Sequence, residues 1–114
     1  MTVKHEQVDN EEIRKVFLYL ARIFEDDVKK NLHTKEIKTE IDGLYAVKIT
    51  VKKDVFTLDE VDFLFSLIRS DYVKRRLKVK IIFYINNNDE GVVELTIVPK
   101  QRLISYFVKR LKYY

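Results

Sequence analysis

The sequence predicts one α+β domain in the order α-β-β-α-β-β-α, with a four-stranded antiparallel sheet that carries its helices on one face. Three observations support this fold class. The chain has 114 residues, of which 46% are apolar, enough for a buried core. Apolar residues follow helical spacing in some segments and strand alternation in others. The same order of segments also occurs twice along the chain.

The first half contains a helix followed by a hairpin. Residues 9–31 have helical spacing, and we expect Asp9 to cap this helix, with Glu12 three residues later as in a capping box. Residues 34–53 alternate apolar and polar side chains, which favours two strands, and Asp42-Gly43 between them is a hairpin signal. The apolar stripe of the helix consists of Ile13, Val16, Phe17, Leu20, Phe24 and Val28.

The second half repeats this order. Thr57 opens a second helix, with Glu60 again three positions later. A third strand is expected from Lys78 to Ile85, a loose turn over residues 86–91, and a fourth strand from Val92 to Val98 that ends at Pro99. Residues 101–113 have the spacing of a closing helix. The predicted buried face of the second helix consists of Val61, Leu64, Phe65, Ile68 and Tyr72.

One offset aligns the two halves. Phe17 matches Phe65 and Gly43 matches Gly91, each 48 residues apart. This match predicts one domain over residues 1–114 with pseudo-repeats over about 9–54 and 57–102, followed by the closing helix.

Composition excludes several classes of function. The absence of cysteine excludes disulfides, thiolate zinc sites and cysteine nucleophiles, and two isolated histidines do not make a metal site. No apolar run reaches the ~18 residues of a membrane span, and the first residues lack a signal-peptide core, so a cytoplasmic location without a membrane partner is expected. Residues 1–54 carry 11 basic and 11 acidic side chains, whereas residues 55–114 carry 11 and 7, which gives a basic second half.

The strand alternation leaves a lysine-bearing sheet face without a helix to cover it. Its lysines could meet phosphates while its other polar groups meet base edges. An ordinary solvated sheet face is the other interpretation, and it is the more frequent one in antiparallel sheets. The predicted DNA-binding residues are Lys38, Lys48, Thr50, Lys52, Lys78, Lys80, Tyr84 and Thr96.

The end of the first helix reads LARIFEDDV, from Leu20 to Val28, and resembles the motif of the LAGLIDADG homing endonucleases. The α-β-β-α-β-β-α order, Lys52 near the end of the second strand and Lys100 before the last helix also follow that family's pattern. The two glycine positions of the motif hold Arg22 and Val28 instead. The resemblance covers the chain from about residue 10 onward.

The resemblance implies double-stranded DNA binding by a homodimer, with endonuclease activity lost or weakened. It places Asp27 at the family's cation-binding aspartate, where Mg²⁺ would suit oxygen ligands, and it places Lys100 near the scissile phosphate as a second catalytic candidate. In an active version the chain would be a Mg²⁺-dependent endonuclease or nickase. The other interpretation of the acidic cluster around Asp27 is a solvated helix end, and this is the more frequent case.

A second motif lies near the C-terminus. Gln101, Ile104 and Phe107 have the spacing of the short peptide by which replication proteins dock on the sliding clamp. Ile104 and Phe107 also lie on the stripe that would face the core. This motif supports the alternative function, a small protein-binding adaptor or inhibitor of the kind that viruses and plasmids encode.

Overall fold

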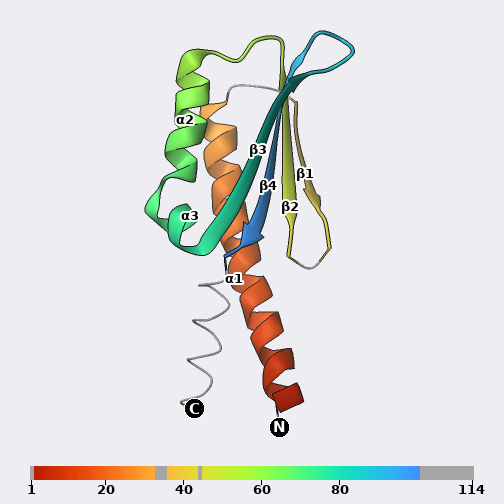
Figure 1. Ribbon diagram of the computed structural model, residues 1–114, viewed down its shortest axis with the longest axis vertical. Helices are drawn as coiled ribbons and strands as arrows, with labels where there is room; N and C mark the ends of the chain where they lie inside the picture. The colour runs from red at the N-terminus through yellow and green to blue at the C-terminus, as the bar shows by residue number, and fades with distance from the viewer. Residues whose placement is uncertain (1, 33–35, 44, 101–114) are drawn as a thin grey trace.

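The computed structural model describes residues 2–32, 36–43 and 45–100, which form three helices and four strands (Figure 1). The first helix, α1 (Thr2–Asn31), buries most of its predicted stripe, including Phe17, Phe24 and Val28, each at 0% exposure. The predicted cap at Asp9 is wrong, because the helix begins seven residues earlier at Thr2. Residues 2–8 contain no proline or glycine that would end a helix, so its backbone continues through residue 9.

The four strands form one antiparallel sheet in the order β1-β2-β4-β3. They are β1 (Glu36–Ile41), β2 (Val47–Lys53), β3 (Leu77–Ile85) and β4 (Gly91–Pro99). Each hairpin contributes its second strand to the centre and its first strand to an edge. Gly43 has a φ of 74°, the left-handed conformation that the predicted Asp42-Gly43 turn requires.

A broken helical segment joins the two hairpins. The helix α2 (Leu58–Ile68) begins with the predicted capping box of Thr57 and Glu60. The helix does not continue to Tyr72 as predicted, because Ser70 adopts an extended conformation and its hydroxyl donates to the Leu67 carbonyl over 2.6 Å. The chain then forms the short helix α3 (Asp71–Arg76), which runs directly into β3.

The helices lie together on one side of the sheet, as predicted (Figure 1). Central strand residues that alternate toward this side include Ile49, Leu95 and Ile97, which are completely buried and share one core with α1 and α2. One prediction for α2 fails. Phe65 is 38% exposed, and Leu67 is buried in its place at 7%.

The strands do not follow the offset of 48 found in the sequence. In the first hairpin Ile41 pairs with Val47, and in the second Ile85 pairs with Gly91, so corresponding residues are 44 positions apart. The sequence match therefore placed Gly43, in a turn, against Gly91, at the start of a strand. None of the described helices is long and apolar enough to cross a membrane. The predicted closing helix lies outside the described residues.

Candidate nucleic-acid interface

The side of the sheet that faces away from the helices gathers the DNA-binding residues predicted from the sequence. The ladders align them in rows across the strands. In one row Lys48 pairs with Thr96, which pairs with Lys80 on the far side. Neighbouring strands lie about 4.8 Å apart, which separates the two lysine backbones by roughly 10 Å with the threonine between them. All eight predicted residues lie on this open face: Lys38, Lys48, Thr50, Lys52, Lys78, Lys80, Tyr84 and Thr96.

Acidic side chains share the open face and pair with some of its lysines. Lys38 lies 2.8 Å from Glu40, and this hydrogen bond raises the pKa of the lysine and lowers that of the carboxyl group. Lys48 lies 3.5 Å from Glu94. The first pair is exposed and the second is half-buried, and ion pairs that solvent reaches in this way contribute little to stability. The lysines remain the majority, because the only other acid among the described residues of this face is Glu36.

The charge is not evenly shared between the two hairpins. Lys78 and Lys80, on β3, form no ion pair with a described residue. Tyr84, on the same strand, donates to Glu94 over 2.9 Å, which raises the pKa of its hydroxyl. The β3 side of the face therefore presents the least compensated positive charge.

A shallow hollow lies on the open face over β1 and β2. Tyr84 reaches it from the opposite edge of the sheet. Val92 of β4 lies between Lys52 and Tyr84, and it is only 1% exposed although it belongs to the open face. Val92 pairs with Lys52 on one side and with Tyr84 on the other, and we infer that these long side chains cover it. The hollow is lined by Glu36, Ile37, Lys38, Glu40, Thr50, Lys52 and Tyr84.

The proposed cation ligand Asp27 lies in the helical layer, apart from the lysine face. The Tyr72 hydroxyl donates to its carboxylate over 3.2 Å, and Asn31 donates to its main-chain oxygen over 2.8 Å. Burial and the neighbouring Asp27 raise the pKa of Tyr72, so the hydroxyl keeps its proton and the hydrogen bond. Among the residues that the structure describes, no three acidic or histidine side chains gather as metal ligands.

The other members of the acidic cluster have separate surroundings. Glu25 lies 3.3 Å from Lys29. Burial acts to raise the pKa of Glu25, but hydrogen bonds with Thr39 and Lys29 outweigh it and lower the pKa. Asp26 and Arg22 are exposed. The three acids of the motif therefore do not converge on one point.

Lys100 lies at the end of β4 beside α3. Its N–H donates to the Arg76 carbonyl over 2.8 Å, and its ammonium group donates to the Lys74 carbonyl. Lys100 therefore supports the junction between α3 and the sheet. The predicted partner-binding residues, Gln101, Ile104 and Phe107, lie outside the described residues.

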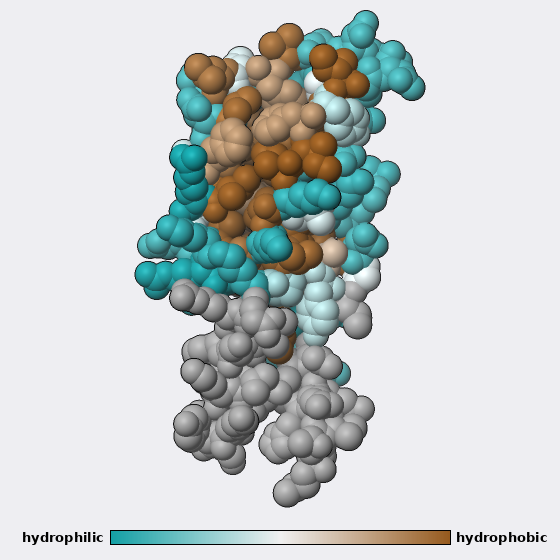
Figure 2. Space-filling model, in the orientation of Figure 1, coloured by the Kyte–Doolittle hydropathy of each residue, from teal (hydrophilic) through white to brown (hydrophobic). Residues whose placement is uncertain are grey.

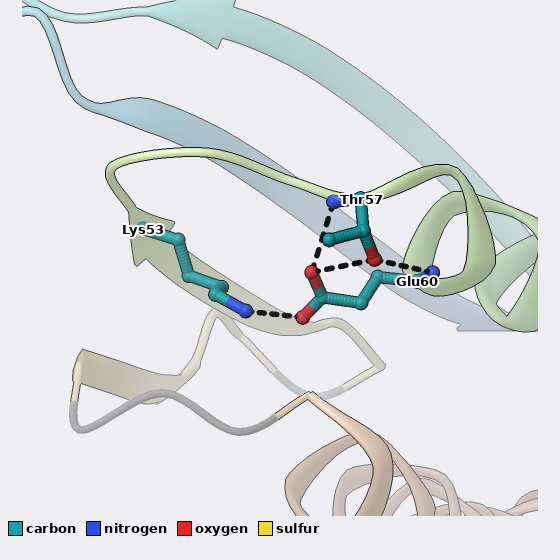
Figure 3. A network of polar contacts seen from close by, with 3 residues as sticks. All are labelled: Lys53, Thr57 and Glu60. Carbon is teal, nitrogen blue, oxygen red and sulfur yellow. Dashed lines mark hydrogen bonds and ion pairs between the residues drawn. The ribbon is translucent and has the colours of Figure 1, made fainter.

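A polar network that the sequence analysis missed joins β2 to α2 (Figure 3). One carboxylate oxygen of Glu60 accepts from the Thr57 N–H over 2.9 Å and from its hydroxyl over 3.0 Å, and the other oxygen accepts from Lys53. Burial acts to raise the pKa of Glu60, but these hydrogen bonds outweigh it and lower the pKa. The capping box was readable from the sequence, whereas the lysine comes from a strand and had no local signal.

Comparisons with family models, with curated proteins and with solved structures each find no match to this chain. The functional interpretation therefore rests on the geometry of the open face.

Proposed function

We propose that this chain is a double-stranded DNA-binding protein that uses the open face of its sheet. The observation that carries the proposal is the arrangement of lysines on three strands of one exposed surface, with threonines between them. Lysines that replace counterions along the phosphate backbone supply affinity without sequence preference. Hydroxyl groups between the lysines are suited to contacts with phosphates and base edges.

The proposal concerns binding and does not require cleavage. The Asp27 carboxylate is engaged by Tyr72 in the helical layer. The order of helices and strands supports a relationship to the LAGLIDADG endonucleases, and this relationship is part of the proposal. A binding protein of this lineage would keep the sheet surface while its cation site serves to hold α3 against α1.

Titration of a labelled DNA duplex at several salt concentrations tests the proposed interface. The informative variant is Lys78→Ala/Lys80→Ala, because neither lysine pairs with a described acid. The matched control is Lys15→Ala/Lys30→Ala, which removes the same charge from exposed positions of α1.

We expect the β3 variant to weaken binding and to reduce the slope of log affinity against log salt by about 2, one unit for each phosphate contact. The α1 variant should bind as the unchanged protein does. Equal losses in both variants would indicate attraction by net charge alone. Absence of salt-dependent binding in the unchanged protein would reject the proposal.

A further inference from the structure

The strand β3 is an edge of the described sheet, and its outer side offers a row of backbone groups that bond to no described strand. At one end of β3 Asn86 donates its N–H to the Glu90 carbonyl, and at the other Arg76 accepts from Lys100. Antiparallel ladders alternate bonded and non-bonded pairs, so even-numbered residues of β3 bond to β4. The outward-pointing N–H and C=O groups belong to Val79, Ile81, Phe83 and Ile85, whereas the N–H of Leu77 donates to the Val73 carbonyl at the end of α3.

The same edge is rich in exposed apolar side chains. Ile82 is 39% exposed, Phe83 42% and Ile85 73%. Phe65 of α2 packs beside Phe83 with 6.3 Å between their ring centroids and is itself 38% exposed. Figure 2 shows the resulting apolar area between α2 and β3 on the side toward the viewer. An exposed apolar edge strand is a template for pairing with another strand.

We propose that β3 pairs with β3 of a second copy of this chain, antiparallel about a two-fold axis at Ile82. A register centred at residue 79 would place Lys78 opposite Lys80, and one centred at residue 80 would place Lys80 opposite itself. Like charges directly opposite each other destabilise a sheet. A register centred at Ile82 avoids both lysine–lysine pairs. It places Lys80 opposite Tyr84 and sets the two Ile82 side chains opposite each other.

In this register the outward-pointing backbone groups of the two β3 strands lie opposite each other and can form hydrogen bonds. Ile81 meets Phe83 of the second copy, and Val79 meets Ile85, so the bonded pairs fall on residues whose N–H and C=O groups point outward. Ile82 and Phe83, which are 39% and 42% exposed, lie at the centre of the contact, and Ile85 lies toward its ends. Lys80 opposite the Tyr84 ring also permits a cation–π contact.

Charges on the helical side are complementary under the same two-fold axis. One face of α2 carries Asp62 and Phe65, and Arg69 continues this spacing at the C-terminal cap of the helix. Both charged residues are exposed. Phe56, just before α2, approaches Gly91 at the Ile85 end of the edge, so the two helices run in opposite directions across the axis. The acidic end of each α2 is thereby directed toward the basic end of the other.

The pairing does not depend on the proposed function, although it would extend it. The two-fold axis is perpendicular to the sheet, so both open faces lie on the same side of one eight-stranded sheet. The lysines of the two β3 strands would then lie near its centre.

Sedimentation of the full chain without DNA tests the pairing. We expect the mass of two chains, and the mass of one chain for Ile82→Lys, which sets two like charges on the axis. The substitution should not prevent folding, because the first hairpin has a lysine, Lys38, at the position that corresponds to Ile82. The control Ile41→Lys adds the same charge to the β1 edge and should remain a dimer with an unchanged melting temperature.

Amide hydrogen exchange identifies the surface involved. The N–H groups of Val79, Ile81, Phe83 and Ile85 should become more protected as protein concentration rises. Those of Ile37 and Thr39 on the outer side of β1 should not. A single-chain mass for the unchanged protein, or a dimer whose β3 amides stay unprotected and that survives Ile82→Lys, would overturn the pairing.

Discussion

The two hairpins have the same pairing geometry, yet their edge strands differ in length and in chemistry. The first edge, β1, has six residues and places Glu36, Lys38 and Glu40 on the open face. The second edge, β3, has nine residues and places Lys80, Ile82 and Tyr84 at the corresponding positions. Charged residues protect an edge strand from association. The comparison indicates that β1 is protected against pairing, whereas β3 is available for it.

The largest expected effect comes from the core that both hairpins share. Leu95 of β4 is fully buried at the centre of the sheet, so Leu95→Ala should lower the free energy of unfolding by about 2–5 kcal/mol through lost burial and the cavity left behind. Ile41→Ala, at a side chain that is 61% exposed on the β1 edge, is the control outside the proposed dimer contact and should change little. Denaturant unfolding measures both. Equal effects would contradict the assignment of β4 as a core strand.

The junction of the first hairpin with α2 should give the next largest effect. Lys53→Met leaves the buried Glu60 without its lysine and should cost about 1.5–3 kcal/mol in unfolding free energy. The corresponding residue of the second hairpin, Ile97, is an apolar core residue and cannot form such an ion pair. An unchanged unfolding midpoint for Lys53→Met would show that the network of Figure 3 does not stabilise the fold.

This junction should also depend on pH. The pKa of Glu60 is lowered in the folded chain, so its contribution is fully present above the ordinary value of 4.5. The contribution is lost as pH falls through the lowered pKa and the carboxylate gains a proton. Thermal unfolding from pH 7 to pH 3 should therefore show a smaller acid-induced loss in Glu60→Gln than in the unchanged protein. Parallel curves for the two proteins would contradict this prediction.

The contact of Asp27 with α3 should have a smaller effect. Tyr72→Phe removes the hydroxyl that donates to Asp27 and should cost about 0.5–1.5 kcal/mol in unfolding free energy. Denaturant unfolding measures this change.

The proposed role of Asp27 in holding α3 also makes a prediction about cleavage. When DNA is incubated with Mg²⁺, Asp27→Asn and the unchanged protein should give the same pattern of DNA fragments. Cleavage that disappears in Asp27→Asn would restore the nuclease interpretation.

The smallest effect concerns the protected edge. Glu40→Gln releases Lys38 from its ion pair and makes the open face more basic. We expect slightly tighter DNA binding, with a salt slope steeper by up to about 0.9 if Lys38 gains one phosphate contact. Asp26→Asn, at an exposed position of α1, changes net charge equally and should not alter the slope. Equal effects would remove the distinction between the open face and the helical layer.

Local patterns predicted most of the fold. Alternation placed all eight DNA-binding candidates on one face, and the Asp42-Gly43 turn and the Thr57 capping box are confirmed. The start of α1 was misjudged because a capping residue is also tolerated inside a long helix. The break at Ser70 was missed because the apolar spacing continues across it.

The features that the sequence did not predict depend on contacts between distant segments. Tyr72 meets Asp27 across 45 residues, which no local pattern signals. The order β1-β2-β4-β3 decides which strands become edges, and only this order shows that β3 carries an exposed apolar edge. The offset of 48 matched individual letters, whereas the ladders align the hairpins at 44.

The most direct test of DNA binding by the open face is a map of amide chemical shifts during titration with a DNA duplex. The account predicts that the largest shifts occur at Lys48, Thr50, Lys80 and Thr96, and that α1 residues such as Lys15 and Lys30 do not move. Shifts concentrated on α1, or no shifts at DNA concentrations that saturate binding, would contradict it.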